Sequence, residues 1–285
     1  VDSALAALAQ VDDIRILAAP GLNLAYIYEA VTVHCEARRD CVAIFDGPAR
    51  LDDEVMNVLS GRSREAGGWR MPPSSDGGFT TFYAPWIRVV DPAGATTLVP
   101  PSGHIAGAWA RNDAERGVHK APAGLPLTGA LDVGRHFTTA EQESLNPRGV
   151  NLIRVFPGRG VLLWGARTLS PDPEWRYVNV RRFMTMVMRS IASQTSWVVF
   201  EPNNEPLWGR LRATIENFLI GLWREGAFPG VRPEEAFFVR CDRSTMTQID
   251  IDSGRLMVLL GLAVVRPAEF TLLRLTFADG VWKLS

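Results

Sequence analysis

The strongest constraint on the fold is the alternation of short apolar runs and helical patterns in the first sixty residues. Residues 14–18 and 41–45 are short apolar runs, and each is followed by a turn that contains Pro and Gly. Between them, residues 24–36 place apolar side chains on one face at helical spacing. Asp52 and Asp53 then open a helix that runs to about residue 59, where acidic side chains suit the positive end of the helix dipole. Strand, helix, strand and helix in this order predict an α/β layer on a buried, partly parallel sheet.

The rest of the chain continues in mixed α and β patterns. Residues 61–78 are rich in Gly, Ser, Pro and Arg and are expected to form an exposed loop. Helices are expected at 102–115, 138–146, 180–194 and 206–223, and strands at 79–84, 87–90, 96–99, 150–156, 161–164, 197–200, 237–241, 256–265 and 270–277. We therefore expect an α/β (α+β) fold, a mixed sheet flanked by helices, with an added β-hairpin region and an extended C-terminal arm strand.

This pattern also divides the chain. We expect a core domain over residues 1–254, in which 61–101 form a loop or hairpin insertion, and C-terminal strands with a linker arm over 255–285. Val1 in place of Met indicates that the chain is a fragment or a trimmed form.

Composition argues against several classes of function. With 30 Lys and Arg against 31 Asp and Glu, the chain lacks the basic excess of a nucleic-acid-binding protein. The doublets Arg38-Arg39 and Arg181-Arg182 are expected to be salt-bridging surfaces. The 3 cysteines have no regular spacing, which suits a reducing cytoplasm. The longest apolar run, 256–265, is too short for a membrane span of about 20 residues, and no signal peptide is visible.

Motifs for catalysis are weak. The 4 histidines are isolated in sequence, and no metal-ligand spacing surrounds them. Gly158-Arg159-Gly160 lies between two apolar runs and predicts a hairpin turn rather than a phosphate loop. Glu201 and Glu205 flank an expected helix start, where acids act as caps and dipole partners. No catalytic, cofactor-binding or metal-ligating residue is assigned, no cofactor is expected, and the chain is not expected to be an enzyme.

Several stretches in order along the chain resemble the contractile phage tail sheath family. They are IRILAAPGLNLAYIYEAVTVHCEARRDCVAIFDGP (14–48), GHIAGAWARNDAERGVHKAPAG (103–124), NPRGVNLIRVFPGRGVLLWGARTL (146–169), YVNVRR (177–182), VVFEPNNEPLW (198–208) and GRLMVLLGLAVVRPAEFTLLR (254–274). The match is to the family's conserved core and C-terminal arm. Family members carry a further N-terminal region with an extended arm, so this chain on its own is expected to be a monomer or to make weak contacts.

The resemblance implies a structural subunit of a phage tail, a bacteriocin or an extracellular contractile injection system. Such subunits polymerise as stacked hexameric rings around an inner tube and contract to drive the tube through a target membrane. The implied partners are other copies of the chain, the inner tube protein, and baseplate and terminator proteins, with no nucleic acid and no direct membrane insertion. Assembly in the bacterial cytoplasm and residence in a virion tail or a released tail-like particle are implied as well.

The resemblance also points to residues that contact neighbours. In the family, extended arms insert as strands into a neighbour's sheet, and the arm here is expected to comprise Phe270, Thr271, Leu272, Leu273, Arg274, Leu275, Thr276 and Phe277. From the residues alone, a terminal strand in the chain's own sheet is the alternative. Contacts to neighbours or to the tube are equally balanced against internal buttressing for Arg111, Asp113, Glu115 and Arg116. Two other functions stay open, an α/β hydrolase with an unrecognised site and a baseplate component of the same particle.

Overall fold

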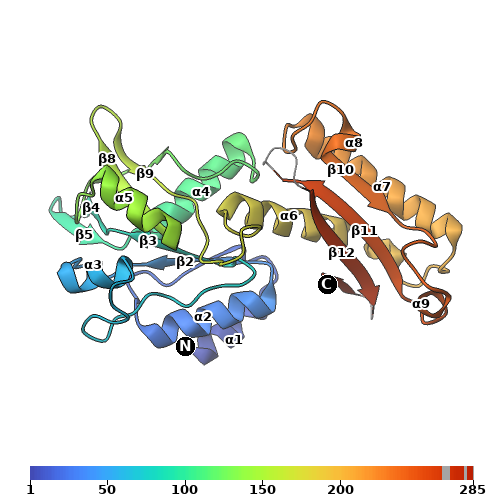
Figure 1. Cartoon of the computed structure of the whole chain (residues 1–285), viewed down its shortest axis with the longest axis horizontal. Helices are drawn as coiled ribbons and strands as arrows, with labels where there is room; N and C mark the ends of the chain where they lie inside the picture. Colours follow the sequence, from blue (N-terminus) through green and yellow to red (C-terminus); the bar gives the residue numbers. More distant parts are fainter. Residues whose placement is uncertain (265–269, 279–280, 285) are drawn as a thin grey trace. The chain divides into compact units, whose positions relative to one another are not determined.

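The computed structural model describes residues 1–264, 270–278 and 281–284. The chain divides into two compact units, Val1–Thr185 and Met186–Ser285, and the boundary lies within helix α6 (Val178–Gln194) (Figure 1). The expected boundary between core and arm at residue 254 falls inside the second unit, directly before a strand, and stays a prediction.

A six-stranded mixed sheet forms the centre of the first unit. Its first four strands run parallel and its last two pair antiparallel. The expected partly parallel sheet is therefore confirmed, and the Gly158-Arg159-Gly160 segment makes the expected tight turn between antiparallel strands. The strand order is β1 (Ile16–Ala18), β2 (Val42–Asp46), β3 (Thr80–Ala84), β8 (Val150–Phe156), β9 (Gly160–Leu163) and β6 (Leu125–Pro126).

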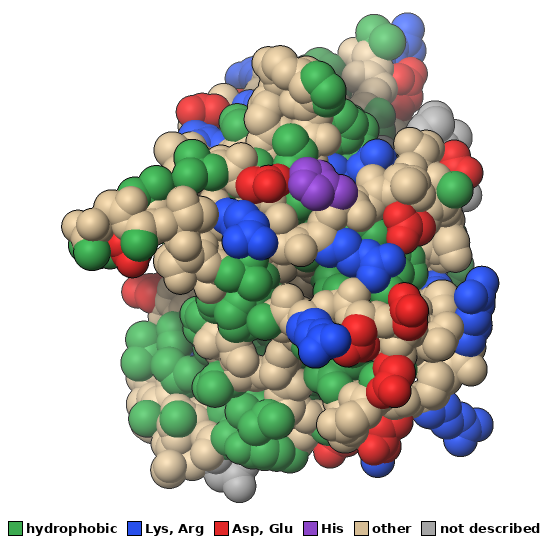
Figure 2. All heavy atoms as spheres, turned by 90° about the vertical axis from the view of Figure 1, so that its left-hand side faces the viewer, with side chains coloured by type: hydrophobic (Ala, Val, Ile, Leu, Met, Phe, Trp, Pro, Cys, Tyr) green, Lys and Arg blue, Asp and Glu red, His purple; other side chains and the backbone are tan. Residues whose placement is uncertain are grey.

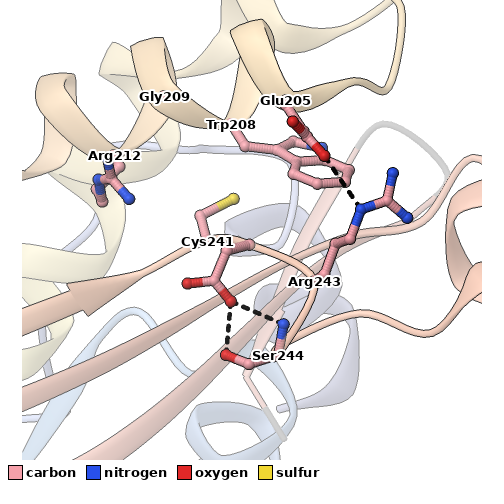
Figure 3. A pocket seen from close by; sticks show the side chains of 8 residues that line it. Glu205, Trp208, Gly209, Arg212, Cys241, Arg243 and Ser244 are labelled. Atoms are coloured by element: carbon pink, nitrogen blue, oxygen red, sulfur yellow. Dashed lines mark hydrogen bonds and ion pairs between the residues drawn. The ribbon is translucent and has the colours of Figure 1, made fainter.

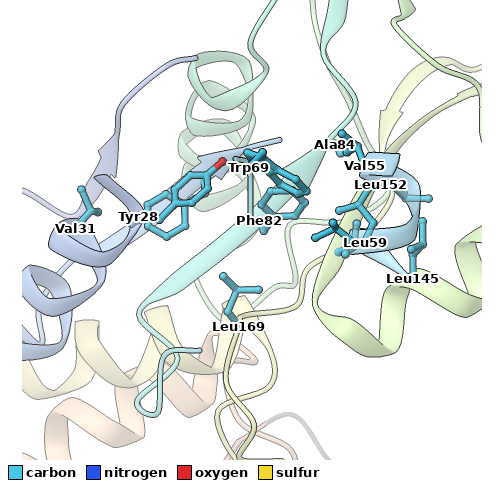
Figure 4. Close-up of a cluster of buried hydrophobic side chains, with 14 of the residues drawn as sticks. Tyr28, Val31, Val55, Leu59, Trp69, Phe82, Ala84, Leu145, Leu152 and Leu169 are labelled. Carbon is cyan, nitrogen blue, oxygen red and sulfur yellow. The ribbon is translucent and has the colours of Figure 1, made fainter. Parts of the chain in front are cut away.

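Both faces of this sheet are buried, because successive side chains of a strand point to opposite faces. On β2, Ala43 and Phe45 belong to one apolar cluster, while Val42 and Ile44 belong to the other. The first cluster (Figure 4) packs under the helices α2 (Ala25–Arg38), α3 (Asp53–Leu59) and α5 (Thr139–Leu145). The second packs under α4 (Ser102–Arg116), and short α1 (Asp2–Leu8) lies against α2.

Polar contacts fix the ends of these elements. Asp52 caps α3 by accepting from the Val55 amide at 3.1 Å, and Thr138 with Glu141 makes a capping box on α5. The buried carboxylate of Asp46, at the end of β2, accepts hydrogen bonds from the Gly21 amide and from Ser102. The Ser102 hydroxyl donates to Asp46 and ties the start of α4 to the sheet.

The added hairpin region is a separate small sheet. Strand β4 (Ile87–Val90) pairs with β5 (Thr96–Val99) on one side and with β7 (Ala130–Val133) on the other. Residues 61–78 are mostly exposed, but Trp69 turns inward and packs on Phe82, with ring centroids 6.2 Å apart. The 3-10 turn η1 (Asn146–Arg148) leads into β8.

The second unit is an antiparallel sheet with a long helix. Helix α7 (Glu205–Arg224) buries Leu207, Leu211, Ile215 and Leu219 on one face and contacts the first strand of the sheet. Short helices α8 (Pro233–Ala236) and α9 (Gln248–Asp252) precede strands. The sheet order is β10 (Phe237–Arg240), β11 (Leu256–Ala263), β12 (Phe270–Ala278) and β13 (Val281–Leu284).

The prediction of a strand at residues 197–200 is wrong. Ser196–Val198 form a 3-10 turn, η2, that continues from α6 through the Val198 amide bonded to the Thr195 carbonyl. Val198 is buried, but Phe200 is fully exposed and has a positive φ of 72°. A four-residue apolar run does not distinguish a strand from a helical turn, and this one was too short to decide.

Candidate interaction surfaces

The predicted arm forms a strand beside β11. Strand β12 pairs antiparallel with β11 over eight positions, from Leu256 opposite Phe277 to Ala263 opposite Phe270. Strand β13 pairs in turn with β12. In the single chain, the arm residues therefore lie in the chain's own sheet, and their donation to a neighbour stays a prediction. The preceding residues of the same motif, 265–269, lie outside the described residues.

The four charged residues on α4 have different surroundings. The Asp113 carboxylate pairs with Arg182 on α6, and Arg182 Nη1 lies 3.0 Å from Asp113 Oδ1. Arg111 donates to the Pro126 carbonyl and the Thr128 hydroxyl at 2.6 and 2.8 Å. Glu115 and Arg116, in contrast, are exposed at the end of α4. Arg111 and Asp113 thus support the fold internally, while the contacts of all four with neighbours or the tube stay a prediction.

The arginine doublets differ from the expected salt-bridging surfaces. Arg38 pairs with Asp40 at 2.6 Å, as expected. Arg181 is buried and lies between two rings, 4.3 Å from the centroid of Phe79 and 4.1 Å from that of Trp175. Burial lowers the pKa of its guanidinium to about 9. The expectation of a surface is therefore wrong for Arg181, whose side chain joins α6 to the loop before β3.

A hollow of about 360 Å³ lies between α7 and the loop after β10 (Figure 3). Glu205 and Arg243 pair across it at 3.0 Å, so this carboxylate is already neutralised. Burial raises the pKa of the Cys241 thiol to about 12, which keeps it protonated and weakly nucleophilic. Glu201 pairs with Arg210 at 3.0 Å, and Asn204 caps α7. These acids serve the helix start and give no general acid and base pair.

Charged and apolar side chains are mixed at the surface. On the face shown in Figure 2, acidic and basic side chains are interspersed with apolar ones. Across the described ranges, three or more His, Cys, Asp or Glu side chains are nowhere grouped as a metal site would require. Within the same ranges, no helix combines the length and apolar character of a membrane span.

Two family models match the chain consecutively. The phage tail sheath protein central domain matches residues 1–169, and the phage tail sheath C-terminal domain matches residues 170–278. Both describe a structural component of a tail rather than a catalytic domain. The chain belongs to the phage tail sheath family.

Curated relatives and solved structures agree with this assignment. A putative prophage major tail sheath protein of Pseudomonas aeruginosa is 24% identical over 93% of the chain and 65% of its own length. The tail sheath protein of Salmonella phage ViI is 27% identical over 86% of the chain and 40% of its own length. The chain thus spans less than two thirds of either curated relative.

Among solved structures, one similar chain comes from an extracellular contractile injection system and another from the baseplate of a prophage. One, from a PVC sheath complex in the contracted state, is 37% identical with a TM-score of 0.78, covering 95% of this chain and 72% of that one. The other, from the baseplate of the anti-feeding prophage, is 35% identical with a TM-score of 0.77, covering 95% and 71%. The fold of this chain is therefore that of sheath proteins.

Proposed function

We propose that this chain is the structural subunit of a contractile tail sheath. It polymerises as stacked hexameric rings around an inner tube and contracts to drive the tube through a target membrane. The observation that carries the proposal is the fold similarity to a sheath complex in the contracted state, at 37% identity over 95% of the chain. A structural role requires no catalytic residue.

Strand exchange is the physical basis of assembly in this proposal. Strand β11 offers its backbone donors and acceptors to β12 over eight paired positions. These groups are satisfied equally well by the same segment of a second copy, because strand pairing is made by backbone atoms. The arm residues 270–277 of one subunit thus complete the sheet of a neighbour and connect the particle.

Contraction follows from the same connection. Each subunit moves as a nearly rigid body, because its cores are close-packed and resist gradual deformation. The exchanged strands keep neighbours attached while the interfaces between rings change.

The partners follow from this arrangement. They are other copies of the chain, the inner tube protein, and baseplate and terminator proteins. Nucleic acid binding and membrane insertion have no part in the mechanism. The subunit assembles in the bacterial cytoplasm and functions in a virion tail or a released tail-like particle.

Electron microscopy of the full-length protein tests the proposal. Wild-type protein should form hollow tubes with stacked rings, and deletion of residues 270–277 should leave it unassembled. Replacing residues 92–95, the exposed part of the turn between β4 and β5, by Gly and Ser should preserve the tubes. Normal tubes without residues 270–277 would rule out strand exchange as the basis of assembly.

A baseplate component is the second candidate. Two of the similar structures, at 35% identity, come from anti-feeding prophage baseplates. Labelled subunits found only at one end of the particle, rather than along its length, would favour this function.

A further inference from the structure

Three arginines line one hollow of the first unit. The hollow, of about 240 Å³, lies between the turn that enters β8 and the loop that follows β9. Arg148 comes from the turn, while Arg167 and Arg176 come from the loop. Arg148 is exposed and the other two are half-buried, so solvent reaches all three side chains.

The motif at residues 146–169 supplies most of the lining of this hollow. Its uncharged residues make contacts within the chain. The buried Asn151 amide donates to the Arg167 carbonyl at 2.7 Å and accepts from the Arg167 amide at 2.7 Å. Gly165 must lack a side chain, since a Cβ there would lie 2.7 Å from Asn151 Oδ1. Thr168 donates to the Trp175 carbonyl at 2.6 Å. These contacts position the loop, but none of them involves the guanidinium groups of the three arginines.

The charges of the three arginines are not neutralised by any acidic side chain in the described part of the chain. Over residues 1–264, 270–278 and 281–284, none of the three forms an ion pair. In the same loop, the Asp172 carboxylate accepts from the Glu174 amide at 2.9 Å. Like charges that share a hollow repel one another, so an anion placed between them is favoured.

Two of the arginines are held in place. Arg148 Nε donates to the Leu59 carbonyl at 2.8 Å, and its guanidinium lies against Gly61, where a Cβ would be 2.3 Å from Nη1. The Arg167 guanidinium lies 5.9 Å from the ring centroid of Tyr177. Side chains fixed in this way lose little entropy when they bind a carboxylate, for which the planar guanidinium is well suited.

We propose that this arginine hollow is a docking site for exposed carboxylates of a second copy of the chain. The inference rests on the proposed sheath function, which brings copies into contact. Charge complementarity supports this occupant, because the chain also displays carboxylates without a partner. Asp53 and Glu54, adjacent at the start of α3, are exposed and form no ion pair within the described ranges. In this proposal the arginine hollow supplies the cations, and exposed carboxylates such as those at the start of α3 supply the anions.

Cross-linking identifies the occupant directly. In tubes of full-length Arg176→Lys protein, a carbodiimide activates a carboxylate, the new amine attacks it to form an amide, and the reagent leaves as a urea. Mixing 15N-labelled and unlabelled copies lets mass spectrometry separate bonds between copies from bonds within one. We expect bonds from position 176 to an Asp or Glu of another copy. Bonds only to Asp172 or Glu174 of the same copy, bonds to a different protein, or no bonds would overturn the proposal.

Charge reversal measures the contribution of the site to assembly. Arg167→Glu with Arg176→Glu should raise the protein concentration needed for tube formation about tenfold or more, since attraction becomes repulsion. Replacing both by Lys should preserve tubes, and Arg88→Glu, an exposed position on β4, is the matched control. Circular dichroism verifies that each variant is folded. Tubes from the double Glu variant at the wild-type concentration would overturn this site alone, whereas absence of tubes from wild type would overturn the sheath function itself.

Discussion

At the scale of single residues, Asn151 shows how one buried amide holds the sheath fold together. It is fully buried and connects three backbone groups, donating to the carbonyls of Phe82 and Arg167 and accepting from the Arg167 amide. It thereby joins β3, β8 and the loop that presents the arginine hollow.

Asn151→Ala should destabilise the first unit by roughly 2–4 kcal/mol, because it leaves buried backbone groups without hydrogen bonds. Urea unfolding followed by tryptophan fluorescence measures the change. Asn217→Ala, at an exposed position on α7, should shift the transition by less than about 0.5 kcal/mol. An Asn151 variant as stable as wild type would show that the loop is held by other contacts.

Glu141 should give the fold a pH dependence of its own. Hydrogen bonds from the Thr138 backbone and side chain, together with Arg135 at 3.2 Å, lower the pKa of its carboxyl from 4.5. Its stabilisation is therefore present above the unfolded pKa and is lost as pH falls through the folded pKa. Glu141→Gln should cost about 0.5–1 kcal/mol at pH 7 and almost nothing at about pH 2–3.

Thermal unfolding across this pH range measures the effect. Glu143→Gln, at an exposed position of the same helix, controls for the lost charge. A Glu141→Gln deficit that stayed constant down to pH 2 would contradict the assigned role.

At the scale of elements, α4 and α6 are joined by an ion pair with little solvent access. The Arg182 and Asp113 side chains are 8% and 22% exposed, and the guanidinium lies 4.9 Å from the ring centroid of Trp109. This pair links two of the recognised motifs through the interior of the first unit.

Asp113→Ala should destabilise the protein by about 2–4 kcal/mol, because it leaves an almost buried guanidinium unpaired. Arg182→Met combined with Asp113→Ala should be more stable than Asp113→Ala alone, since no uncompensated charge remains. A double-mutant cycle from chemical unfolding checks this, and simple additivity of the two changes would contradict it.

Elements with strong periodicity could be predicted from the sequence, whereas isolated short runs could not. The alternation in residues 14–59 predicted β1, α2, β2 and α3 with boundaries within two residues, because buried parallel strands and amphipathic helices leave clear patterns. The strand predicted for Trp197–Phe200 was wrong, since only tertiary packing decides whether four apolar residues form a strand or a helical turn. The arginine hollow could not be predicted from the sequence either. Its three arginines are distant along the chain and come together only because Asn151 positions the loop.

At the scale of the whole molecule, the proposed assembly depends on whether strand β12 pairs within its own chain or with a neighbour. The β11–β12 register can be satisfied within a chain or between chains with the same backbone hydrogen bonds, so concentration and geometry decide between the two. The proposed docking at the arginine hollow would add a charged contact that favours one arrangement of neighbours. Assembly is therefore expected to weaken as salt concentration rises, in proportion to the exposed charges involved.

The most direct test of strand exchange is a cross-link in the β11–β12 register. Leu259 and Arg274 are paired positions, so full-length protein carrying both Leu259→Cys and Arg274→Cys is assembled into tubes and oxidised, with Leu259→Cys alone as the control. On a denaturing gel without reductant, exchange predicts a ladder of covalently joined copies. Tubes that yield only single chains with an internal disulfide would show that each subunit keeps its own strand, and would contradict the account.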